Sequence, residues 1–170
     1  MSEPIELVLK RMSASDRHLL QISLHMNPIF VANADGNYSF REQSAMAQSV
    51  RQLMSEPAYR PLIPLAGQRP ISEASLRVLM AEYGGDLDGY LEKLGDLLSV
   101  LPDDVVRAYR EFTMSAIVNV AEASRDGFFG LVGDKISDEE KLLIRKMIQK
   151  LSLEPGEEQR AKLGMSKDKS

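Results

Sequence analysis

Two stretches of the chain carry acidic residues around an Asp-Gly pair, a pattern that can bind a metal ion. Each stretch follows an apolar helical segment, passes through Asp-Gly to Ser-x-x-Glu, and enters another amphipathic segment. Their carboxylates would supply only oxygen ligands, which suit a hard cation such as calcium or magnesium better than zinc. A single site shared between the two stretches would use the carboxylates of Asp35, Glu42, Asp126 and Glu140.

The Ser-x-x-Glu spacing also has a purely structural explanation. A Ser at a helix start accepts a hydrogen bond from a free backbone N–H, and a Glu three residues later reaches back to the amide of that Ser. Ser39 with Glu42 and Ser137 with Glu140 both fit this capping box. Asp-Gly before a helix is ordinary turn chemistry, because Gly accepts a positive φ without strain. Helix capping alone and a cation site are therefore both open as explanations.

A calcium loop of the EF-hand type fits these stretches less well than a looser shared site. With Gly36 at the sixth position of the loop, Asp35 and Glu42 fall at ligand positions, but Val31 stands where an Asp is expected. With Gly133 at the sixth position of the second loop, the earlier ligand positions are apolar or Gly. The sequence therefore predicts no paired EF-hand.

Helical periodicity dominates the segments that must position these acids. Apolar residues recur every three or four positions, whereas the strict alternation of a strand is hard to find. We predict an all-α fold: a single domain of about seven helices with two helix–Asp-Gly-loop–helix repeats. The expected helices span residues 4–12, 15–34, 40–55, 72–83, 87–101, 103–125 and 137–152, with a short eighth over 155–163.

Prolines and polar segments divide this pattern. Pro28 falls inside a helical pattern, so we expect it to kink that helix or to split it in two. Four prolines mark residues 56–71 as a long connector. We expect residues 1–155 to form the helical domain and residues 156–170 to form a polar C-terminal tail.

Composition excludes several classes of site. The 170 residues include no Cys, which rules out disulfides, zinc–thiolate sites, iron–sulfur clusters and cysteine nucleophiles. The net charge of −4 gives no reason to expect a nucleic-acid partner. No apolar run approaches the ~20 residues that span a bilayer, and the first residues lack the pattern of a secretory signal. We therefore expect a cytoplasmic protein without membrane insertion; its oligomeric state is not predicted.

Two further features of the sequence are candidate sites. His18 and His25 are two helical turns apart, roughly 10.5 Å along a helix axis, which is too far for one metal ion. Residues 128–133 alternate Gly with apolar side chains and form either a loop tucked over the core or a surface that docks a protein partner.

The repeated motif resembles the TerB-like family, which is associated with tellurite resistance and whose fold also occurs in the N-terminal region of DjlA-type co-chaperones. The residues that carry the resemblance are 31–42 and 120–141, and it extends over about residues 15–155. It implies an all-helical fold in which acids of the two repeats lie near each other and are linked to metal binding. Carried over by position, these acids are Asp35, Glu42, Asp126 and Glu140, with Glu139 as a neighbour and Asp134 as a rival of Asp126.

The function expected from this resemblance is a non-catalytic module that binds a divalent metal ion and has a role in stress or tellurite response. One alternative is an interaction scaffold that docks a partner through residues 128–133. A second alternative is an enzyme that uses the acidic cluster to hold a catalytic metal ion, although the sequence indicates no base or nucleophile beside these acids.

Overall fold

The structure is a computed structural model, and it describes residues 3–34, 48, 50–66, 72–126 and 136–165. All regular structure in these ranges is helical, and none of it is a strand. No helix in the same ranges is long and apolar enough to cross a membrane. Residues 50–54 are helical. The named elements are α1 (Ile5–Arg11), α2 (Ala14–Ala32), η1 (Pro57–Leu62), α4 (Ile63–Ala66), α5 (Glu73–Gly84), α6 (Leu87–Leu98), α7 (Asp103–Asp126), α8 (Asp138–Leu151) and α9 (Glu157–Lys162).

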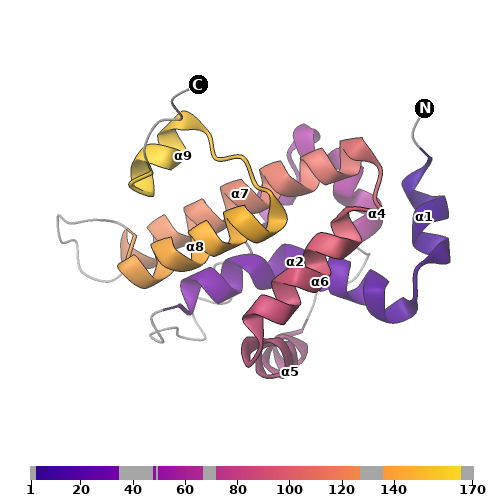
Figure 1. Cartoon of the computed structure of the whole chain (residues 1–170), viewed down its shortest axis with the longest axis horizontal. Helices are drawn as coiled ribbons and strands as arrows, with labels where there is room; N and C mark the ends of the chain where they lie inside the picture. Colours follow the sequence, from indigo (N-terminus) through magenta and orange to yellow (C-terminus); the bar gives the residue numbers. More distant parts are fainter. Residues whose placement is uncertain (1–2, 35–47, 49, 67–71, 127–135, 166–170) are drawn as a thin grey trace.

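Helix α2 is the centre of the fold. It packs against α4, α5, α6, α7 and α8, and α7 in turn packs against η1 and α8. Figure 1 shows α2 and α7 running in the same direction, with α8 returning beside α7. The C-terminal ends of α2 and α7 and the start of α8 consequently lie at one end of the molecule, while α1 and α4 lie at the other (Figure 1).

The apolar stripes expected from the sequence form the core. On α2 the stripe includes Leu19, Ile22 and Met26, and on α7 it includes Tyr109 and Phe112, all at most 2% exposed. Each fully buried side chain of this size contributes roughly 1.5–3 kcal/mol relative to an exposed one. The all-helical prediction is therefore confirmed, and the core lies where the periodicity placed it.

Several helices begin at the polar residues that favour a helix start. The Ser13 side chain accepts a hydrogen bond from the Asp16 amide at 3.0 Å, and Asp86 Oδ1 accepts one from the Gly89 amide at 3.0 Å. Ser72 caps α5 in the same way. These caps satisfy backbone N–H groups that have no partner inside the helix.

Pro28 lies inside α2 and does not split it. The helix runs from Ala14 to Ala32, and Pro28 is buried among its apolar neighbours. A proline in a helix interior removes one hydrogen bond and costs about 3 kcal/mol. Burial of nearly every side chain from Leu19 to Ala32 offsets this cost. Of the two expected outcomes, a kink or a split, the split is wrong, because α2 continues through Pro28.

The proline-rich connector contains two short helices. Residues 57–66 form η1 and α4, in which Tyr59, Leu62 and Leu65 are buried. Pro57 is at the start of η1, where its missing N–H is not needed and its fixed φ suits the first turn. Pro57 therefore marks a helix start, and residues 57–66 are helical rather than irregular.

Candidate functional site

The structure describes only part of the predicted metal site. Asp35, Glu42 and the rival Asp134 lie outside the described residues, as do Ser39 and residues 128–133. Asp126 is the last residue of α7, and its side chain also lies outside the described part. Glu139 is exposed, whereas Glu140 is only 2% exposed. No group of three or more His, Asp or Glu residues gathers among the residues that the structure describes.

Glu140 forms the capping box that its spacing predicts. The Ser137 amide donates a hydrogen bond to Glu140 Oε2 at 2.8 Å, and the Glu140 amide donates to Ser137 Oγ at 3.2 Å. This exchange satisfies two backbone donors at the start of α8. The structural explanation of the second Ser-x-x-Glu motif is therefore confirmed, and it holds one oxygen of a buried carboxylate in place.

Both repeats leave the helical bundle at the same end. The first begins at the end of α2, and the second joins the end of α7 to the start of α8 (Figure 1). These three helices pack against one another. The arrangement places the described ends of the two repeats on one side of the molecule.

A group of buried polar side chains, here called the polar cluster, lies inside the core and comprises Ser23, Asn27, Tyr90 and Tyr109. Ser23 Oγ is 2.6 Å from the Tyr109 hydroxyl and donates to the Leu20 carbonyl at 2.7 Å. Asn27 Nδ2 donates to the Tyr109 hydroxyl at 3.0 Å, and the Tyr90 hydroxyl donates to Asn27 Oδ1 at 2.8 Å. The polar cluster thus links α2, α6 and α7, and its signal in the sequence was a Ser and an Asn within the apolar stripe of α2.

Burial controls the ionisation of the two tyrosines in the polar cluster. Burial raises the pKa of Tyr109 to about 12, although hydrogen bonding to Ser23 and Asn27 and the nearby Thr113 hydroxyl oppose the rise. Burial is the main reason that the pKa of Tyr90 lies well above its usual value, and the neighbouring Tyr109 and Tyr83 raise it further. Both phenols are neutral hydrogen-bonding groups at neutral pH.

We expect the protein to lose stability as the pH rises through about 10 to 12. Above about pH 10 a tyrosine in the unfolded chain loses its proton, while Tyr109 in the fold keeps its proton until about pH 12. Deprotonation therefore favours the unfolded chain, by roughly 3 kcal/mol for this residue once both forms have titrated. Urea unfolding at a series of alkaline pH values measures the slope with which the free energy of unfolding falls as the pH rises. Tyr109→Phe removes this contribution, and an unchanged slope in that variant would contradict the assignment.

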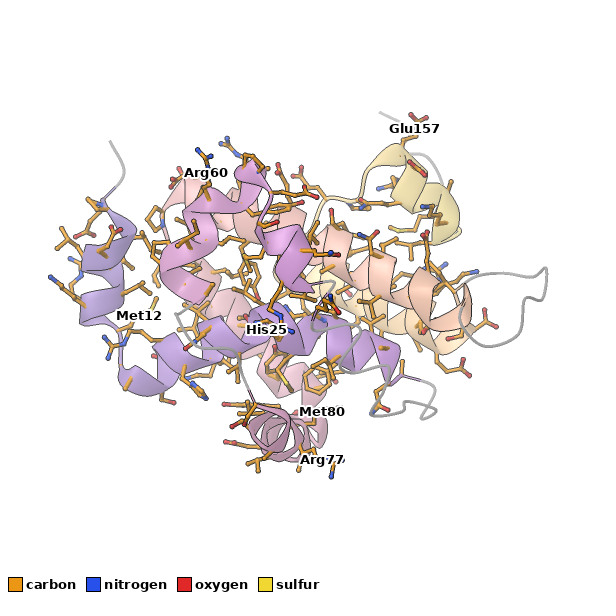
Figure 2. The ribbon with its side chains drawn as sticks, turned by 180° about the vertical axis from the view of Figure 1, so that it is seen from behind. Met12, His25, Arg60, Arg77, Met80 and Glu157 are labelled. Carbon is orange, nitrogen blue, oxygen red and sulfur yellow. The ribbon has the colours of Figure 1, made fainter. Side chains whose placement is uncertain are left out.

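The two histidines occupy different environments. His18 is exposed, whereas His25 is half-buried and lies midway along α2, close to α4 in the view of Figure 2. Burial lowers the pKa of His25, and the positive charge of Arg51 lowers it further. His25 is therefore a neutral side chain at neutral pH.

A pocket of about 360 Å³ lies between α1, α2 and α4. Its lining combines apolar side chains with an Arg, a His and a Gln: Leu9, Ala14, Arg17, His18, Gln21, Pro64 and Leu65. Three separate segments of the chain contribute these residues, and for that reason no sequence motif marks the pocket.

Comparison with known proteins found no matching family model, no similar curated protein and no similar solved structure. The resemblance to the TerB-like family consequently rests on the repeated motif, and the function that it implies is a proposal.

Proposed function

We propose that the chain is a cytoplasmic, non-catalytic TerB-like module that binds calcium or magnesium through acidic residues of its two repeats, with a role in stress or tellurite response. The observation that carries the cation site is the common end of the bundle from which both repeats leave (Figure 1). Asp35 and Glu42 follow α2, while Asp126 and Glu140 flank the second loop. Convergence of the helix ends supports a site shared between the repeats.

The environment of Glu140 supports its role as a ligand of such a site. Its carboxylate is almost fully buried, and one oxygen accepts the Ser137 amide at 2.8 Å. A carboxylate has two oxygens and about four lone-pair positions, so one carboxylate can accept a capping bond and ligate a cation at the same time. Fixing one oxygen also reduces the side-chain entropy that ligation would otherwise lose. Capping and cation binding are therefore compatible at the same residue.

We expect Glu140→Gln to weaken cation binding while the protein keeps its fold. Gln also serves as the third residue of a capping box, so the bond to the Ser137 amide survives and only the charge is lost. Titration of calcium, magnesium, manganese and zinc, followed by NMR shifts of Gly36 and Gly127 and by melting temperature, measures the response. In the wild type we expect calcium or magnesium to change the NMR shifts and the melting temperature. In the variant we expect the affinity for that ion to fall at least about tenfold.

Two comparison variants separate capping from cation binding. Ser137→Ala removes the cap and should lower the free energy of unfolding by ~1 kcal/mol with or without a cation. Glu111→Gln removes an exposed acid of α7. It should change neither the affinity for the cation nor the free energy of unfolding. Absence of any response to the four ions at millimolar concentration would overturn the proposal. A response that survives Glu140→Gln, Asp35→Asn and Glu42→Gln would place the cation elsewhere.

A further inference from the structure

The pocket between α1, α2 and α4 has the features of a ligand site. Figure 2 shows Met12 at the turn between α1 and α2, at the edge of the molecule that is remote from the two repeats. The volume of about 360 Å³ falls at the low end of the ~300–1,000 Å³ typical of small-molecule sites. The pocket is separate from Glu140 and from the described ends of the two repeats, which lie at the opposite end of the fold (Figure 1).

Hydrogen bonds from α2 hold the other two helices that line the pocket. Arg17 Nη1 donates to the Leu9 carbonyl of α1 at 3.4 Å, and Gln21 Nε2 donates to the Ala66 carbonyl of α4 at 3.2 Å. Leu65, which is 4% exposed, anchors α4 in the core. The pocket is thus assembled before any ligand enters it, which lowers the ordering cost of binding.

The two leucines that line the pocket are more buried than its Arg and His. Leu9 is half-buried and Leu65 is buried, and both supply apolar surface to the lining. Arg17 and His18 are exposed and belong to the solvent side of the lining. A ligand with a polar head and an apolar body matches this division.

The charge at the solvent side of the pocket is positive. None of the described residues that line the pocket is acidic, and the ion pairs among the described residues involve neither Arg17 nor His18. The one acid in the first turn of α2, Asp16, is paired instead with Lys93 of α6 at 3.2 Å. The long hydrogen bond to the Leu9 carbonyl uses only one of the five N–H donors of Arg17. The guanidinium therefore keeps donors for an anionic group.

We propose that this pocket binds a small carboxylic acid with a short aliphatic chain. The planar guanidinium of Arg17 matches a carboxylate with two parallel hydrogen bonds. His18 is a second exposed polar group in the lining. The aliphatic chain packs over Leu9 and Leu65, where it displaces water from apolar surface. The small volume restricts the ligand to a short chain rather than a long-chain fatty acid.

Titration of the full chain with hexanoate, followed by backbone amide NMR shifts, tests this proposal. We expect shifts at Leu9, at residues 14–21 and at Leu65. Hexan-1-ol and hexylamine have the same chain without the negative charge, and we expect both to bind at least about tenfold more weakly, because they lose the charge-assisted pair. Arg17→Gln should weaken hexanoate binding by a similar factor.

Matched variants distinguish a carboxylate site from a merely apolar one. Arg107→Gln removes an exposed Arg of α7 and should leave hexanoate binding unchanged. Arg17→Lys keeps the charge but loses the paired hydrogen bonds, so its affinity should fall between those of the wild type and Arg17→Gln. The proposal is overturned if hexanoate causes no shifts, if the shifts lie elsewhere, or if hexan-1-ol binds as well as hexanoate.

Discussion

Replacing Asn27 with Leu is expected to lower the free energy of unfolding by about 3 kcal/mol or more. The Asn27 side chain is fully buried, donates to the Tyr109 hydroxyl and accepts from the Tyr90 hydroxyl. Leu removes both bonds at once and leaves the Tyr90 hydroxyl without that acceptor in an apolar core. A buried polar group that loses its partner costs about 1–3 kcal/mol. Equilibrium urea unfolding, followed by circular dichroism, measures the change.

A triple variant tests whether unpaired hydroxyls cause the loss at Asn27. Adding Tyr90→Phe and Tyr109→Phe to Asn27→Leu removes the two phenolic hydroxyls, while Ser23 keeps its bond to the Leu20 carbonyl. Replacing all partners of a hydrogen bond by apolar groups is often nearly neutral, so the triple variant should recover part of the lost stability. A triple variant less stable than Asn27→Leu alone would instead mean that the side chains no longer pack.

The stripe on α2 shows how much of the fold the sequence could predict. Leu19, Ile22 and Met26 recur at helical spacing, and that local pattern is enough to identify a helix and its buried face. The start of α8 was also predictable, because the Ser137–Glu140 capping box depends only on residues three apart. By contrast, the hydrogen bonds of Asn27 reach residues 63 and 82 positions away, so they depend on how the helices pack.

The candidate site was predictable only where its geometry is local. Capping by Glu140 follows from spacing, whereas ligation by the same carboxylate depends on residues of the other repeat. Pro57 was misread because a fixed φ suits both a connector and the first turn of a helix; burial of Tyr59 and Leu62 decides between them. The pocket around Arg17 could not be predicted at all, because α1, α2 and α4 form it only after folding.

Replacing Leu163 with Ala is expected to destabilise the whole fold, by about 2–4 kcal/mol. This residue follows α9 in a segment that the sequence marks as a polar tail, yet its side chain has no exposed surface. Arg145 of α8 donates to the Leu163 carbonyl at 2.7 Å, and Lys162 pairs with Glu122 of α7 at 2.7 Å. These contacts hold the end of α9 against both helices. Truncating a buried Leu to Ala costs the transfer energy of the lost methyl and methylene groups plus that of the cavity left behind.

Leu142→Ala is the matched control for the substitution at Leu163. Leu142 lies on α8 but is 68% exposed, so its truncation should change the free energy of unfolding by at most about 0.5 kcal/mol. Urea unfolding of both variants compares the same chemical change at a buried and an exposed position. If Leu163→Ala unfolds at the same urea concentration as Leu142→Ala, α9 contributes nothing to stability and residues 156–170 behave as a tail. A lower midpoint for Leu163→Ala alone would make α9 part of the cooperative unit, since only interactions formed in the folded state and lost on unfolding move the midpoint.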